Sequence, residues 1–293
     1  MLHEEHLYSI ALRATPLIGD VNFMRLVEIT GSAKETWHLS KKLLKEIPGI
    51  GSKITKEIGN EKYLKFAEKE IDFCEKNNIK INLRHLKELP KLLSNCDDAP
   101  AILYQKGSVD ESLTPISIVG TRNMTSYGKH FIEEFLEILK NKKVLIVSGL
   151  ALGTDGCAHT EALKNQLKTA GVLAHGLHLI YPSQHKKLAA EILEQDGALL
   201  TEFNSNDKPD REHFLQRNRI VAGFSPVTVV VETAFGGGSM STVSYANDYN
   251  REVFALPGKI NDKYSQGCNL LIAQNKARIL QNFEEILDEL QLG

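Results

Sequence analysis

Residues 116–122, ISIVGTR, combine a short run of β-branched residues with a glycine and a cationic side chain. An apolar run of this length that ends at glycine is typical of a buried strand followed by a tight turn. Five further runs of the same kind follow, each separated from the next by a helical segment. They are VLIVSG (144–149), TAGVLAHG (169–176), GALLTEF (197–203), VTVVVET (227–233) and EVFALPG (252–258). This alternation predicts a Rossmann-like, doubly wound and mostly parallel sheet wrapped by helices.

The region before these strands has a different pattern. From Leu7 to about Ile81 it is helical and polar, with breaks at prolines and glycines and no convincing strand. We therefore predict a small all-helical domain of the SAM-like or helix-hairpin-helix kind over 1–82, a linker and edge segment over 83–115, and the Rossmann-like domain over 116–293. The last stretch, NFEEILDELQLG, is expected to form a terminal amphipathic helix.

The composition is that of a globular protein. The 293 residues are 42% hydrophobic and carry a formal net charge of -2, so any nucleic-acid site must be a local basic patch. Cys74, Cys96, Cys157 and Cys268 lack the spacing of zinc or redox motifs and are expected to be free thiols. No stretch approaches the roughly 20 apolar residues that a bilayer requires. We expect a cytoplasmic protein with no membrane insertion.

Small and polar residues follow three of the predicted strands. They are Gly120, Thr121 and Arg122, then Ser148 and Gly149, and finally Gly237, Gly238 and Ser239. In an open parallel sheet, ligands bind beyond the carboxyl ends of the strands. Glycine lets the backbone approach a phosphate, and the N–H groups at a helix N-terminus attract one. Each glycine alone is explained equally well by a tight turn, but three clusters together predict a phosphate site. Neither the dinucleotide-binding fingerprint nor the Walker A motif is present.

Two basic clusters add candidate phosphate contacts. Arg217, Asn218 and Arg219 stand directly before the apolar run IVAGF, and guanidinium and amide groups bind phosphate oxygens. Lys186 and Lys187 follow a tyrosine-proline turn, where surface charge explains them equally well.

Other residues are assigned structural roles. Phe214 and Tyr181 would suit base stacking, but aromatic residues beside apolar runs usually belong to the core, and both are placed there. Asp155, Cys157 and His159 lie close in sequence, yet no second set of ligands converges on them, and Asp155 is explained by the dipole of a helix start. No catalytic residue, metal or cofactor is predicted.

Helix starts and one hairpin are also predicted. Thr125 or Ser126, Ser183 and Ser239 are expected to begin helices. Residues 47–53, IPGIGSK, read as the hairpin of a helix-hairpin-helix motif, whose glycines expose backbone amides to a phosphate. A purely structural turn explains this hairpin equally well.

Seven segments, in order, resemble the DprA/Smf family of DNA-processing proteins and cover nearly all of residues 116–276. They are ISIVGTRNMTSYG, SGLALGTDGCAHTEAL, GLHLIYPSQHKKLA, GALLTEF, HFLQRNRIVAGFS, VVVETAFGGGSMSTVSYA and REVFALPGKINDKYSQGCNLLI. The helical region before them resembles the small domain that precedes the Rossmann-like domain in this family. His178 and the run from Gly236 to Met240 depart from the family pattern, and the winged-helix domain of many members is not expected here.

The resemblance implies a homodimeric protein that binds incoming single-stranded DNA during natural transformation, protects it and loads RecA, without catalytic turnover. Carried over by position, Arg122, Lys186, Lys187, Asn218 and Arg219 line the DNA groove. The closer backbone or hydroxyl contacts then come from Thr121, Ser148 and Gly149.

Two alternatives stay open. Nucleotide phosphoribohydrolases of the lysine-decarboxylase-like type share a Rossmann-like core and a glycine-rich strand end, and Glu232 before Gly236–Gly238 favours that class. The spacing differs from the PGGxGTxxE arrangement of those enzymes. A nucleotide-sensing or interaction module without a DNA role is the third possibility.

Overall fold

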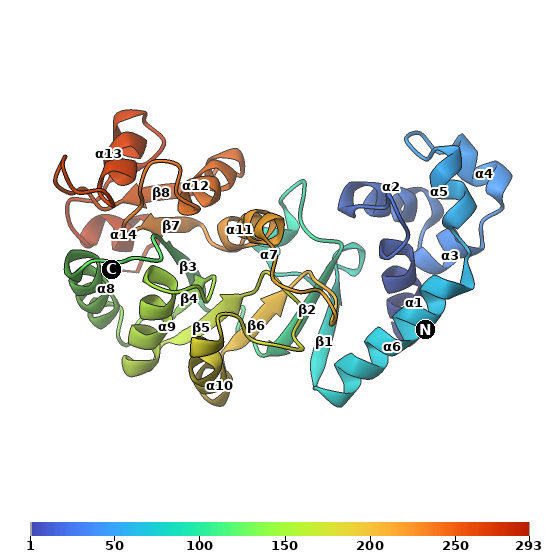
Figure 1. Ribbon diagram of the computed structural model, residues 1–293, viewed down its shortest axis with the longest axis horizontal. Coiled ribbons are helices and arrows are strands. Elements are labelled where there is room, and N and C mark those ends of the chain that lie inside the picture. The colour runs from blue at the N-terminus through green and yellow to red at the C-terminus, as the bar shows by residue number, and fades with distance from the viewer. Residues whose placement is uncertain (1, 293) are drawn as a thin grey trace. The chain divides into compact units, whose positions relative to one another are not determined.

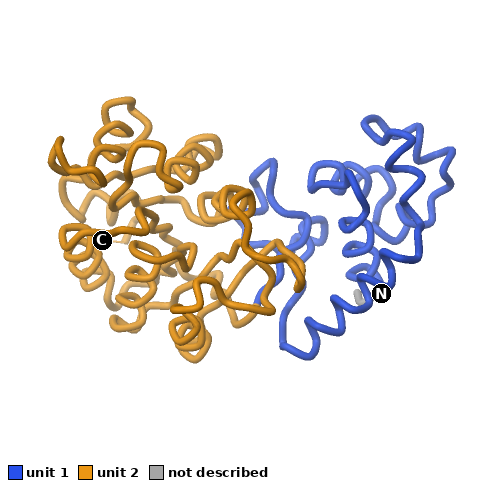
Figure 2. Tube along the Cα trace, viewed as in Figure 1, with its two compact units in different colours: residues 1–105 blue, residues 106–293 orange. Residues whose placement is uncertain are grey.

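The computed structural model describes residues 2–292, which divide into two compact units, one up to residue 105 and one from residue 106 onward (Figure 2). None of the helices within residues 2–292 has the length and apolar composition of a bilayer-spanning segment.

The first unit begins with a series of helices. Its elements are α1 (Leu2–Arg13), α2 (Asp20–Thr30), α3 (Ala33–His38), α4 (Lys41–Glu46), α5 (Ser52–Glu57), α6 (Glu61–Lys76), β1 (Ile79–Leu83), η1 (Arg84–Leu86), α7 (Lys91–Ser94) and β2 (Ile102–Gly107), the last of which runs across the division. The prediction of no strand before residue 82 is wrong at its end. Only two residues separate α6 from β1, so the long helical pattern concealed the five residues of this strand.

The hairpin predicted at 47–53 joins α4 to α5. Gly49 has a φ of +84°, a left-handed conformation that favours glycine. The carbonyl of Pro48 accepts a hydrogen bond of 3.1 Å from Nη1 of Arg25 in α2. The hairpin is therefore tied to the helix beside it.

The second unit contains a parallel sheet. Its strands are β3 (Thr114–Val119), β4 (Val144–Ser148), β5 (Lys168–Val172), β6 (Ala198–Thr201), β7 (Val227–Val230), β8 (Glu252–Ala255) and β9 (Arg278–Ile279). They lie in the order β6-β5-β4-β3-β7-β8-β9, and each neighbouring pair is parallel. The six strands predicted from the sequence and the Rossmann-like fold are confirmed. Only β9, two residues long, was not predicted.

Helices cover both faces of this sheet (Figure 1). They are α8 (Ser126–Ile138), α9 (Thr154–Lys164), η2 (Ser183–His185), α10 (Lys186–Glu194), α11 (Arg211–Phe224), α12 (Ser239–Asp248), α13 (Gln266–Ala273) and α14 (Glu284–Glu289). One face carries α8, α9 and α10, and the other carries α11 and α12. The chain passes from β3 to β6 on one side and returns to β7 on the other, so the strand order reverses between β3 and β7. Ligands of such folds bind at this point.

The predicted helix starts are partly confirmed. The Thr125 hydroxyl accepts a hydrogen bond from Tyr127 N and caps α8. Ser183 begins the short η2 turn and Ser239 is the first residue of α12, but neither side chain caps its helix. At the end of β7, the buried Glu232 accepts hydrogen bonds from Thr125 N (2.8 Å) and Thr125 Oγ1 (2.6 Å). A carboxylate therefore occupies the positive N-terminus of α8.

His159 is fully buried beneath the sheet and is neutral. Its Nδ1 donates to Thr169 Oγ1 at 2.7 Å, because that hydroxyl already donates to the carbonyl of Ile146. Its Nε2 has no hydrogen-bond partner among the described residues. Burial lowers the pKa of His159 to about 3.

This histidine predicts a loss of stability in acid. In the unfolded chain a histidine binds a proton near pH 6.5, so the free energy of unfolding falls by about 1.4 kcal/mol for each pH unit from there towards the pKa of the folded state. We expect His159→Leu to flatten this slope in urea unfolding between about pH 7 and about pH 5. The exposed His130, replaced in the same way, is the matched control. Equal slopes for His159→Leu and the native protein would contradict the assignment.

Candidate functional site

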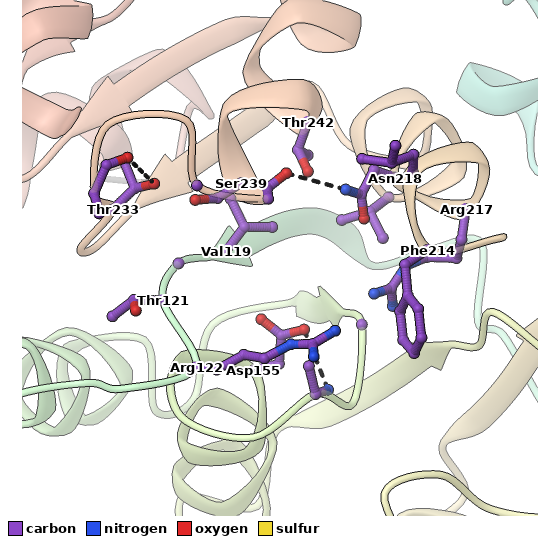
Figure 3. A pocket seen from close by; sticks show the side chains of 18 of the residues that line it. Val119, Thr121, Arg122, Asp155, Phe214, Arg217, Asn218, Thr233, Ser239 and Thr242 are labelled. Carbon is purple, nitrogen blue, oxygen red and sulfur yellow. Dashed lines mark hydrogen bonds between the residues drawn. The ribbon is translucent and has the colours of Figure 1, made fainter. Parts of the chain in front are cut away.

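A pocket of about 320 Å³ lies at the carboxyl ends of β3, β4 and β7, at the reversal of strand order (Figure 3). It brings together most of the predicted phosphate contacts. Those that line it are Gly120, Thr121, Arg122, Gly149, Arg217, Asn218, Gly237, Gly238 and Ser239. Asp155, Phe214, Thr233 and Thr242 also line it and were not predicted to do so.

An aromatic ring lies close to two guanidinium groups in this pocket. Cζ of the exposed Arg122 is 5.0 Å from the centre of the Phe214 ring, and Cζ of Arg217 is 6.0 Å from it. The Tyr181 ring centre is 5.9 Å from that of Phe214, and Tyr181 is 45% exposed. The assignment of Phe214 and Tyr181 to the core is therefore wrong. The apolar residues at the end of α11 are buried, and this pattern wrongly suggested that Phe214, near the start of the same helix, is buried as well.

Arg217 forms an inner wall of the pocket. Its side chain is buried, and Nη1 donates to the carbonyl of Val172. The guanidinium lies against Gly149, where an added Cβ atom would stand 1.9 Å from Nη1. Burial lowers the pKa of Arg217, and the carboxylate of Asp155 opposes this effect. The glycine after β4 thus leaves the space that the guanidinium of Arg217 occupies.

Asp155 brings a carboxylate to the same pocket. Burial raises its pKa, while the charge of Arg217 and the hydrogen bond from Ala151 N oppose this rise. Cys157 packs into the core on the other side of α9, and His159 is bonded to Thr169, so the three residues do not converge. Within residues 2–292, no group of three or more acidic, His or Cys side chains gathers in a way that would hold a metal ion.

The start of α12 forms the opposite wall. The amide of Asn218 donates to Gly238 O (3.2 Å) and to Ser241 Oγ (2.9 Å), which ties α11 to this helix end. Met240 N donates to the carbonyl of Gly237 and Gly237 N donates to that of Ala234, whereas the N–H groups of Gly238 and Ser239 precede the helical ladder. The 7%-exposed Ser239 has no hydrogen-bond partner for Oγ among the described residues. These groups give the wall a positive partial charge.

Four predicted contacts lie outside the pocket lining. Ser148 is fully buried and donates to the Ile118 carbonyl at 2.6 Å, and Arg219 is buried in an ion pair with Glu202. Neither side chain faces a ligand, which corrects the expectation of direct contact for these two. Lys186 and Lys187 are exposed at the start of α10, where Lys187 lies 3.3 Å from a carboxylate of the same helix.

The chain has close relatives among characterised sequences. The model of the family described as DNA recombination-mediator protein A matches residues 80–291. Protein Smf of Synechocystis is 33% identical over 99% of this chain and 74% of its own length. Protein Smf of Escherichia coli is 41% identical over 70% of this chain, which spans about half (54%) of that relative. DNA processing protein DprA of Bacillus subtilis is 38% identical over 70% of this chain and 69% of its own length.

Solved structures agree with this assignment. The crystal structure of DNA processing protein A from Streptococcus pneumoniae matches with a TM-score of 0.79 and 28% identity over 97% of both chains. A structure of the Helicobacter pylori protein, concerned with the single-stranded DNA binding mode of that protein, matches with a TM-score of 0.65 and 29% identity over 73% of this chain and 95% of that one. Because the family match covers most of the sequence and the fold agrees, this chain belongs to the DprA/Smf family of DNA recombination-mediator proteins.

Proposed function

We propose that this protein binds single-stranded DNA in the pocket between β3 and β7, protects the strand and loads RecA onto it during natural transformation. It acts in the cytoplasm as a homodimer, without catalytic turnover. The observation that carries the proposal is the Phe214 ring with the guanidinium groups of Arg122 and Arg217 close to it, 5.0 and 6.0 Å from its centre, at the reversal of strand order. The relatives that process DNA, and the Helicobacter pylori protein that binds single strands, support it.

The groups in the pocket suit the two parts of a nucleotide. Guanidinium groups and the amides at the start of α12 match phosphate oxygens. The ring of Phe214 in the pocket, and that of Tyr181 beside it, offer faces for bases, and stacking of this kind tolerates any sequence. In this proposal Ser148 and Arg219 support the walls, and Lys186 and Lys187 attract the strand beyond the pocket. The proposal assigns DNA binding to residues 116–293, apart from the helical residues 1–82 and the linker 83–115.

The hydrolase alternative loses its main support in this structure. A phosphoribohydrolase needs an acid that is free to act on its substrate. Here both oxygens of Glu232 accept hydrogen bonds from Thr125, and Glu232 does not line the pocket. Incubation with nucleoside monophosphates tests this point, because release of free base would restore the enzyme class.

The function is tested by fluorescence anisotropy with labelled single-stranded and double-stranded oligonucleotides over a salt series. We expect tight, salt-sensitive binding that favours single strands, because a single strand exposes its bases to Phe214. Arg122→Ala should weaken binding about ten-fold, the typical value of a lost charge-assisted contact. Lys129→Ala, which removes a surface charge from α8, is the control. An absence of binding at low salt would refute the proposal.

The paired substitution Lys186→Ala and Lys187→Ala should act through charge alone. Both side chains are exposed and outside the pocket lining, so we expect affinity to fall a few-fold at low salt with no change in stability. The slope of log K against log salt should decrease by about 1.4 if each lysine neutralises one phosphate of a single strand. A slope equal to that of the native protein would place the strand elsewhere.

The homodimer is a separate test. Light scattering at several concentrations should give twice the mass of the chain. A monomer mass at every concentration would contradict this part of the proposal.

A further inference from the structure

The loop between β8 and α13, residues 256–265, carries two lysines and an aromatic ring that the pocket does not use. Lys259 and Lys263 are exposed, and within residues 2–292 neither ammonium group forms an ion pair. Nζ of Lys263 lies 5.5 Å from the centre of the Tyr264 ring. The loop contains a single acid, Asp262, so its two lysines leave one net positive charge.

This loop is joined directly to the wall of the pocket. Thr233 lines the pocket, and its N–H donates a hydrogen bond of 2.7 Å to the carbonyl of Tyr264. The carbonyl of Thr233 accepts a hydrogen bond of 2.8 Å from Gly267 N in the first turn of α13. Because β8 is the parallel neighbour of β7, about 5 Å from it, the segments after both strands lie at the edge of the sheet that holds the pocket. The loop therefore continues the pocket wall along this edge.

Hydrogen bonds hold the loop in one conformation. The side chain of Asn269 exchanges two hydrogen bonds, of 2.9 and 3.2 Å, with the backbone of Gly258. Within the loop, Asp262 N donates to the carbonyl of Lys259 at 3.1 Å, and Ser265 N donates to that of Asp262 at 2.9 Å. A surface that is ordered in advance loses little conformational entropy when a ligand binds to it.

Apolar side chains are exposed on the same two connections. Phe235, which follows the pocket residue Ala234, is 60% exposed, and Ile260 in the loop is 80% exposed. Proteins that bind single strands without sequence preference combine cationic groups for the phosphates with aromatic faces for the bases. A single strand offers its bases to such faces, whereas a duplex keeps them stacked inside. The composition of this surface therefore favours a single strand.

The strand order of the sheet places this loop on one side of the pocket and the α10 lysines on the other. Lys186 and Lys187 belong to the connection after β5, which lies beyond β4, while the loop follows β8, which lies beyond β7. A strand held in the pocket thus meets a cationic surface in each direction along the sheet edge.

We propose that residues 256–265 form a second contact for single-stranded DNA, which leaves the pocket past the turn after β7 and crosses the carboxyl end of β8. Lys259 and Lys263 bind phosphates there, and the ring of Tyr264 stacks on a base. The inference rests on the proposed function, because it extends the path of the same strand. It assigns to this loop a part of the affinity that a long strand has over a short one.

Two lengths of labelled oligothymidylate separate the loop from the pocket. A strand of about four nucleotides occupies the pocket, whereas one of about 12 also reaches the loop. Lys259→Ala with Lys263→Ala should lower affinity for the longer strand about five-fold at low salt and decrease its salt slope by about 1.4, with no change for the shorter strand. Lys140→Ala with Lys143→Ala removes the same charge from the exposed segment before β4, at the opposite edge of the sheet, and is the matched control.

The comparison of these two paired variants decides the inference. Equal affinities of both variants for the longer strand would overturn it. An equal loss for both strand lengths in the loop variant would overturn it as well, because the lysines would then act at the pocket. All four side chains are exposed, so the variants should unfold in urea at the native midpoint.

Substitutions of Asp262 and Tyr264 test the charge and the ring separately. Asp262→Asn removes the acid of the loop, so affinity for the longer strand should rise a few-fold. Tyr264→Ala should lower that affinity about ten-fold, as expected for the loss of a stacked base, while Tyr264→Phe keeps the ring and should bind as the native protein does. Equal losses in Tyr264→Ala and Tyr264→Phe would refute the stacking role.

Light scattering tests whether the loop instead joins two copies of the chain. The variant that lacks both loop lysines should keep the mass of the native protein. A fall in mass together with affinity would assign the loop to protein contact and overturn the inference. Failure of the native protein to bind either strand at low salt would refute the proposed function itself, so the two failures are distinguishable.

Discussion

Replacing Arg217 by alanine is expected to reduce affinity for single-stranded DNA about 100-fold and to lower the free energy of unfolding by about 3 kcal/mol. The guanidinium supplies a positive charge in the pocket and donates to the carbonyl of Val172. Its removal also leaves the carboxylate of Asp155 buried without a nearby compensating charge. The lost hydrogen bond and the uncompensated carboxylate lower the stability of the folded protein. The lost positive charge lowers the affinity for DNA.

Two measurements separate these effects. Urea unfolding gives the change in stability, and anisotropy at a temperature where the variant is folded gives the change in affinity. Arg217→Lys is the matched variant, because it keeps the charge but loses the planar donor geometry, so it should fall between alanine and the native protein. Native affinity in a folded Arg217→Ala protein would show that the pocket does not hold the strand.

Gly149→Ala should have the second largest effect, although it removes no charge. A Cβ atom at this position would lie 1.9 Å from Nη1 of Arg217, so the buried guanidinium must move. We expect a loss of roughly ten-fold in affinity and about 1–3 kcal/mol in stability, as for other overpacked sites. Gly19→Ala is the control, since nothing lies within 4 Å of the Cβ atom it adds. Native binding and stability in Gly149→Ala would mean that Arg217 relaxes at no cost.

The parallel sheet and the place of the pocket were predictable from the sequence. Runs such as VLIVSG and VTVVVET are too short and too rich in β-branched residues for helices, and the helices between them force parallel connections. Because all carboxyl ends of such strands lie at one edge, Gly120, Gly149 and Gly237 had to meet there. The apolar pattern of the strands and the order of strands and helices were therefore sufficient to predict the sheet and the position of the pocket.

The roles of the side chains on α11 could not be predicted from the fact that they are adjacent in the sequence. Arg217 and Arg219 stand two positions apart, which is about 200° around a helix, so one lines the pocket and the other pairs with Glu202. The helical spacing of the residues would have predicted which side chains line the pocket. Phe214, Arg217, Asn218 and Val221 follow the i, i+3, i+4, i+7 pattern of a single face and all line the pocket.

The hydrogen bonds between Thr125 and Glu232 also have a meaning for redesign. A nucleotide-cleaving catalyst built on this fold would need a free acid. Glu232, the acid that precedes the glycine-rich turn in the sequence, already accepts two hydrogen bonds from Thr125. Thr125→Val is the smallest change that frees one oxygen of Glu232, because it removes the hydroxyl donor and keeps the backbone donor. Glu232 would still keep its backbone donor and its place outside the pocket lining, so a new chemistry also requires a change of its position.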